Sequence, residues 1–98
     1  MNKAEIEKRL RDNRASLSAY HVKRMGLFGS QLHGLGHSRS DIDLLVEFGK
    51  TIDLFSFVHL TDELESWLES RVDLVTKQAL KPAIRAQVLE EVEWLEDL

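Results

Sequence analysis

The clearest hydrophobic pattern in the chain is a short alternation over residues 41–48. Its even positions are all apolar, whereas Asp41, Asp43 and Glu47 occupy three of the four odd positions. Alternation with a period of two predicts a β-strand, because successive side chains point to opposite faces of a sheet. Residues 44–46 read Leu-Leu-Val and are apolar on both faces, so we expect this strand to be central and buried.

Weaker patterns on either side predict two more strands and three helices. Mixed apolar runs indicate the strands, and apolar residues three or four positions apart indicate the helices. Asn2 with Glu5 forms a capping box for the first helix, and Pro82 suits the first turn of the last. The predicted strands are 22–28 and 71–76, and the predicted helices are 2–20, 53–70 and 82–95.

This order of elements predicts an α/β fold: helix, strand, loop, strand, helix, strand, helix. We expect a single small domain over residues 1–98, with a short mixed three-stranded sheet and helices packed on it. A chain of 98 residues allows one modest hydrophobic core and leaves no room for a second domain.

Composition and charge narrow the classes of function. The chain has no cysteine, which excludes thiol nucleophiles, cysteine-based zinc sites and iron–sulfur clusters. Its apolar runs are far shorter than the ~20 residues of a membrane span, and its charged first residues carry no secretory signal, so we expect a cytoplasmic protein. The net charge of −4 argues against stable nucleic-acid binding, which usually needs a basic surface. We expect any polyanion that it handles to be small, with its charge met by a metal ion.

The first feature that carries chemistry is Gly29-Ser30, where a predicted strand ends. Glycine lets the backbone come close to a ligand and adopt a positive φ. The amides that follow, together with the Ser30 hydroxyl, can then receive phosphate oxygens. Taken alone, Gly-Ser is a common turn.

The second feature is the pair Asp41 and Asp43 on the central strand. Residues two apart on a strand share a face, with Cα atoms about 6.5–7 Å apart. Two carboxylates held this way at the mouth of a buried strand need compensation, which a pair of Mg²⁺ ions roughly 3.5–4 Å apart would supply. The alternative is a solvated edge strand whose outer face happens to be acidic.

The third feature is Asp73, which lies in the short apolar strand 71–76. A lone aspartate in a strand is more often a structural residue. If this strand pairs beside Asp41 and Asp43, however, three carboxylates on adjacent strands meet the requirement of a two-metal site for phosphoryl-type transfer.

Other eye-catching residues have plainer explanations. His33 and His37 lie in a glycine-containing loop that does not fix them as a zinc pair, and Trp67 belongs to the apolar stripe of its helix. Trp94 lies outside the apolar stripe of the last predicted helix. Its side chain is therefore either exposed and available to a partner protein, or part of the structure, and the sequence leaves both alternatives open.

Taken together, these motifs resemble the minimal nucleotidyltransferases, stand-alone domains of the DNA polymerase beta-like superfamily. The likeness runs from Arg24 almost to the C-terminus. It rests on Leu27-Phe28-Gly29-Ser30, Ser40-Asp41-Ile42-Asp43-Leu44-Leu45-Val46 and Val72-Asp73-Leu74-Val75-Thr76.

The resemblance implies a role for each matched residue. Gly29 and Ser30 would hold the β- and γ-phosphates of ATP, and Asp41 and Asp43 would bind two Mg²⁺ ions. Asp73 would complete the catalytic metal site and help to deprotonate the attacking hydroxyl.

One part of the triphosphate site departs from the family. Relatives often carry arginine where this chain has Gln31 and His33, so His33 or Arg39 is the candidate to contact the triphosphate here.

The resemblance also implies an activity and a partner. Minimal nucleotidyltransferases are typically encoded beside a HEPN-domain ribonuclease toxin, and the implied reaction transfers AMP from ATP to a tyrosine of that toxin. The chain would thus be a protein adenylyltransferase and antitoxin, in a hetero-oligomer with the toxin. Two alternatives remain: an antitoxin that blocks its partner sterically without catalysis, and a nucleotidyltransferase for a small-molecule or RNA acceptor.

Overall fold

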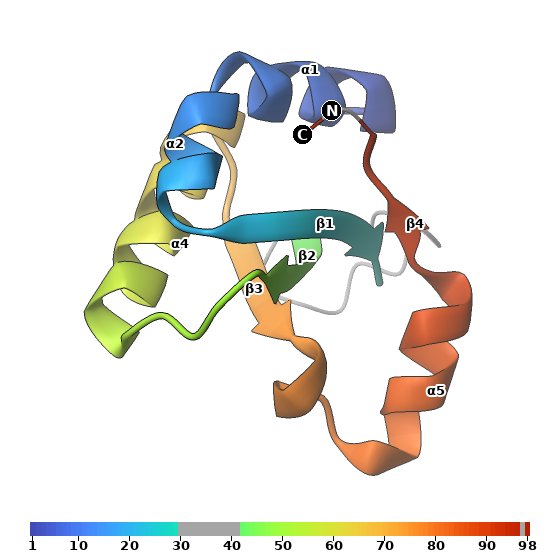
Figure 1. Cartoon of the computed structure of the whole chain (residues 1–98). Coiled ribbons are helices and arrows are strands. Elements are labelled where there is room, and N and C mark those ends of the chain that lie inside the picture. The colour runs from blue at the N-terminus through green and yellow to red at the C-terminus, as the bar shows by residue number, and fades with distance from the viewer. Residues whose placement is uncertain (30–41, 97) are drawn as a thin grey trace.

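The computed structural model describes residues 1–29, 42–96 and 98. Its elements, shown in Figure 1, are α1 (Lys3–Asp12), α2 (Arg14–Ala19), β1 (Val22–Phe28), β2 (Ile42–Phe48), α4 (Leu54–Leu68), β3 (Val72–Thr76), the 3-10 helix η1 (Lys77–Ala79), α5 (Pro82–Glu91) and β4 (Glu93–Trp94). The expected α/β fold is confirmed. No helix in the described ranges is long and apolar enough to cross a membrane.

The strands form one mixed sheet in the order β3-β2-β1-β4. β2 and β3 run parallel, whereas β1 is antiparallel to both β2 and β4. β2 therefore lies inside the sheet, and its residues 42–46 are all buried. The prediction of a central strand that is buried on both faces is confirmed.

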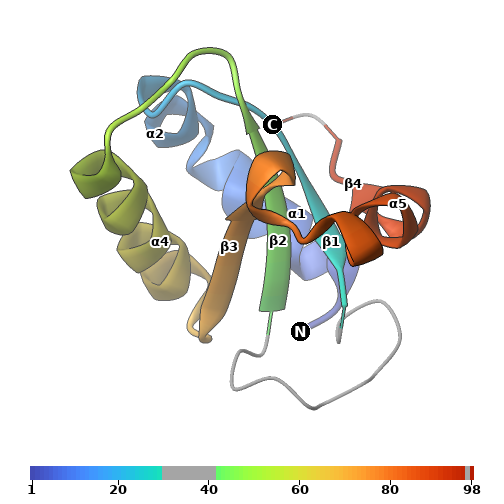
Figure 2. The same ribbon diagram turned by 90° about the horizontal axis from the view of Figure 1, so that it is seen from below.

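Helices cover the two faces of the sheet unequally (Figures 1 and 2). α1, α2 and α4 enclose the larger core on one face, and η1 and α5 lie on the other. The smaller core on that second face is formed by Leu45, Leu80 and Val88. Asp43 lies two residues before Leu45 on the same strand, so it faces the side with the thinner cover.

The sheet has four strands, not the predicted three, because the last predicted helix ends early. α5 stops at Glu91, and the chain then becomes extended and pairs with β1. The apolar spacing of Val92 and Leu95 looked helical, yet the two residues pack into different cores on opposite faces of the sheet. Trp94 is half-buried in β4, where the Arg24 guanidinium lies 3.7 Å from its ring centroid.

Gly26 in β1 makes this fourth strand possible. A Cβ atom at residue 26 would lie 2.4 Å from Val92 Cγ2 and 3.2 Å from the Glu93 carbonyl oxygen. Real Cβ atoms do not show the first distance, and the second is tighter than most real contacts, so a larger residue at position 26 would force the C-terminal segment to shift.

We expect Gly26→Ala to destabilise the fold by about 1–3 kcal/mol, because the added methyl overpacks this contact. Urea denaturation followed by tryptophan fluorescence measures the change. Adding Val92→Ala removes the nearest clashing atom and should restore part of the loss. Unchanged stability of the single variant would show that β4 does not pack on β1 as described.

The predicted first helix is divided in two at Asn13. The Asn13 side-chain amide donates a hydrogen bond to the Arg9 carbonyl oxygen at 2.9 Å, and its backbone leaves helical geometry. Asparagine competes in this way with the helical ladder for backbone partners. The asparagine half of the predicted capping box is confirmed, since Asn2 Oδ1 accepts the Glu5 amide at 2.9 Å.

Candidate active site

Two of the predicted carboxylates lie side by side at one end of the sheet. Asp43 on β2 is in register with Asp73 on β3, and on its other side with Phe28 on β1. Residues directly opposite one another on paired strands share a face and lie about 5 Å apart. The expected pairing of strand 71–76 beside the central strand is therefore confirmed, and it brings the two acids together.

The two acids differ in their exposure. Asp43 is buried, with 6% of its surface exposed, whereas Asp73 on the edge strand is exposed. Partial burial, and then the charge of Asp43, raise the pKa of the Asp73 carboxyl above its ordinary value. The acids are thus held where a cation between them would be stabilised.

This pKa shift predicts how stability depends on pH. The pKa of Asp73 is higher in the folded than in the unfolded protein, so the metal-free fold loses stability as pH rises from the unfolded pKa through the folded one. Asp73→Asn is therefore expected to raise the metal-free urea midpoint slightly at pH 7. This gain should disappear below about pH 3.5, where the unfolded carboxyl is also protonated. A gain of the same size at both pH values would contradict this electrostatic cause.

Gly29 closes the site on the side of β1. Its φ is +69°, which confirms the expected left-handed turn at the end of this strand. A Cβ atom here would lie 2.5 Å from Asp43 Oδ2, so glycine is required for space as well as for conformation. The Asp43 carboxylate thus faces the turn at which phosphate binding is expected.

A glutamate that the sequence patterns did not single out fixes the start of β3. Glu65 on α4 accepts the Val72 amide at 2.9 Å, and the Ile42 amide donates to the Arg71 carbonyl oxygen at 3.1 Å. Both bonds hold the peptide group that joins Arg71 to Val72, and so they fix the start of β3 against α4 and β2. No sequence signal marks Glu65, because its role depends on a contact between a helix and a strand.

We expect Glu65→Leu to lower kcat for nucleotide transfer roughly tenfold with little change in KM for ATP, because Asp73 loses its support. Glu65→Gln keeps an acceptor oxygen and should retain most of the rate. Asp62→Asn, an exposed change on the same helix, is the matched control. Equal losses in the Leu and Gln variants would show that the hydrogen bond to Val72 is not what matters.

The other predicted site residues lie outside the described part of the chain: Ser30, His33, Arg39 and Asp41. Within the described ranges no cluster of three or more histidine, aspartate or glutamate side chains forms a metal site. Asp43 and Asp73 nevertheless fit a divalent cation, since both offer carboxylate oxygens from one face of adjacent strands and Gly29 leaves space beside them.

Comparison of the chain with known protein families shows which family it belongs to. The model of the nucleotidyltransferase domain family matches residues 4–95, nearly the whole chain. The chain belongs to this family. The resemblance predicted from the motifs around Gly29, Asp43 and Asp73 is thereby confirmed at the level of the family.

Individual relatives narrow the comparison within the nucleotidyltransferases. The chain is 39% identical over 92 residues to protein adenylyltransferase MntA of Thermococcus cleftensis, covering 93% of both chains. It is 36% identical over 89 residues to protein adenylyltransferase MntA of Shewanella oneidensis, covering 91% of this chain and 60% of that one.

Solved structures share the fold. A structure assigned to the minimal nucleotidyltransferases superposes with a TM-score of 0.74 at 32% identity, with 95% of each chain covered. A toxin–antitoxin structure with AMP-PNP gives a TM-score of 0.68 at 33% identity, with all of this chain and 75% of that one covered.

Proposed function

We propose that this nucleotidyltransferase is a protein adenylyltransferase antitoxin that transfers AMP from ATP to a tyrosine hydroxyl of a partner HEPN ribonuclease toxin. The observation that carries the proposal is the in-register pair Asp43 and Asp73 beside the left-handed Gly29. It is supported by relatives named as protein adenylyltransferases and by a similar toxin–antitoxin structure with an ATP analogue.

Asp43 and Asp73, together with Asp41, are the residues that would hold two Mg²⁺ ions. When bound, Mg²⁺ lowers the pKa of the attacking hydroxyl and neutralises charge on the leaving pyrophosphate. The buried Asp43 comes from the central strand and is the more rigidly placed of the two described acids. Asp73 lies on the edge strand, where an acceptor from a second protein can reach it.

The transfer makes one bond and breaks one bond. The tyrosine oxygen attacks the α-phosphorus of ATP, the bond from that phosphorus to the β-phosphate oxygen breaks, and pyrophosphate leaves. We assign to the Asp73 carboxylate the role of receiving the proton of the phenol as the new bond forms. We assign the β- and γ-phosphates to the turn at Gly29 and Ser30, with His33 or Arg39 as the further side chain that contacts them.

Labelled ATP tests this assignment directly. The chain, mixed with the neighbouring toxin and Mg²⁺, should move label from α-labelled ATP to the toxin and none from γ-labelled ATP. Replacing the accepting tyrosine of the toxin with phenylalanine should abolish the label. Mass spectrometry of the co-expressed toxin gives the number of AMP groups and their position.

Other outcomes would identify the alternatives. A stable complex that protects against the toxin but transfers no label would mean steric neutralisation. Label on RNA, with none on protein, would move the chain to a nucleic-acid-tailing activity. The substrate ATP and a ribonuclease partner are both consistent with a cytoplasmic location, which stays a prediction.

A further inference from the structure

The carboxyl ends of β2 and β3 form a place where ligands commonly bind in α/β proteins. These neighbouring strands run parallel, yet the chain leaves them toward opposite faces of the sheet. After β2 it enters α4 over the larger core, and after β3 it enters η1 and α5 over the smaller one (Figure 2). In open sheets the crevice outside such diverging strand ends is the usual ligand site. Asp43 and Asp73 lie at the opposite ends of the same two strands.

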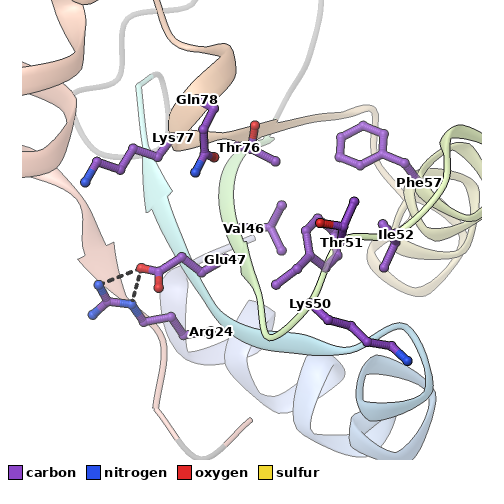
Figure 3. Close-up of a pocket in the computed structure, with 11 residues that line it drawn as sticks. Arg24, Val46, Glu47, Lys50, Thr51, Ile52, Phe57, Thr76, Lys77 and Gln78 are labelled. Carbon is purple, nitrogen blue, oxygen red and sulfur yellow. Dashed lines mark hydrogen bonds and ion pairs between the residues drawn. The ribbon is translucent and has the colours of Figure 1, made fainter.

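The structure has a hollow of about 680 Å³ at this position. That volume lies within the range of about 300–1,000 Å³ typical of small-molecule sites. Its walls come from the end of β2, the connection 50–52, the first turns of α4 and the segment 76–78 (Figure 3). Val46, Ile52 and Phe57 give it an apolar side, while Thr51 and Gln78 supply hydrogen-bonding groups.

The charge around the hollow is positive, although the chain as a whole is acidic. Its single acid, Glu47, is already paired with Arg24, whose guanidinium lies 2.7 Å from the carboxylate and stacks on Trp94. Lys50 and Lys77 stand at opposite rims, and neither forms an ion pair with the residues that the structure describes. Both side chains are exposed and point away from the centre in Figure 3, so rotation of these flexible chains would turn their ammonium groups inward.

We propose that this hollow, defined by Lys50, Thr51, Phe57, Lys77 and Gln78, binds a small organic phosphate that carries an apolar or aromatic ring. The phosphate would be held by the two lysines and the polar groups of Thr51 and Gln78. The ring would pack against Phe57 and its apolar neighbours. This hollow lies at the opposite end of the sheet from Asp43 and Asp73. Binding of the phosphate compound therefore does not require catalysis at those acids.

Magnesium-free NMR titration of the ¹⁵N-labelled full chain tests the proposal, with AMP as the probe and EDTA present. AMP should shift the amides of Thr51, Lys77 and Gln78 and leave those of Gly29 and Asp73 unchanged. Inorganic phosphate lacks the ring and adenosine lacks the phosphate group. Each should therefore bind at least roughly tenfold more weakly than AMP.

A pair of double variants gives the matched control. Lys50→Ala with Lys77→Ala should weaken AMP binding roughly tenfold or more, whereas Lys23→Ala with Lys81→Ala removes the same charge outside the hollow and should leave binding unchanged. The proposal is overturned if AMP at millimolar concentration shifts none of these amides, or shifts those of Gly29 and Asp73 instead. Equal weakening by both double variants would also overturn it, because binding would then reflect net charge alone.

Discussion

Asp43→Asn is expected to abolish transfer of AMP while leaving the protein folded. The buried carboxylate is the more rigidly placed member of the pair, and an amide of the same shape would lack the negative charge that holds Mg²⁺. We expect the rate to fall by at least roughly 10³-fold. Stability should stay the same or rise in the metal-free protein, because repulsion with Asp73 is removed.

The measurement is label transfer to the toxin together with a urea denaturation curve of the variant. Glu90→Gln is the control, because it removes one negative charge at an exposed residue of α5 that is not part of the site. Loss of transfer accompanied by unfolding would instead indicate that Asp43 is needed for the fold.

Gly29→Ala is expected to damage both the site and the fold. A left-handed backbone at a non-glycine residue costs about 1–2 kcal/mol, and the new Cβ would also press on Asp43 Oδ2 at 2.5 Å. Because the carboxylate must move, we expect the transfer rate to fall roughly 10²-fold or more. Gly49→Ala is the matched control, since a Cβ there meets only the His21 carbonyl oxygen at 3.8 Å.

A double-mutant cycle separates the two causes. In an Asp43→Ala background the clash is absent, so Gly29→Ala should then cost only its conformational part of about 1–2 kcal/mol. If the cost is the same in both backgrounds, the carboxylate does not lie against the turn as described. Urea denaturation of the four proteins provides the free energies.

The parts of the fold that the sequence predicted are those set by local patterning. The period-two alternation of β2 and the apolar run of β3 were sufficient to place Asp43 and Asp73 on strands. That these strands pair was a hypothesis, which the structure confirms. β4 was not predicted, because a strand of two residues is too short to show a hydrophobic period. Its pairing with β1 also depends on the close approach that Gly26 allows, which no local pattern indicates.

The parts that could not be predicted depend on contacts between distant segments. α4 buries Leu60, Leu64 and Leu68 but leaves Leu54 72% exposed, although all four are leucines on one helix. Glu65 looks like any exposed acid until the Val72 amide is placed beside it. The hollow at the carboxyl ends of β2 and β3 likewise exists only once the two chain connections have diverged.

The place of β3 at the edge of the sheet affects solubility as well as chemistry. An uncovered edge strand can recruit a strand from another molecule and so begin aggregation. β3 reads Val-Asp-Leu-Val-Thr, so Asp73 is its single charge, and its first amide is already occupied by Glu65. An apolar residue at position 73 would leave this edge strand uncharged and rich in residues that favour β-structure, which is the composition of aggregation-prone segments. We therefore expect Asp73, to which we assign a role in the transfer, also to hinder neighbouring molecules from adding to the sheet.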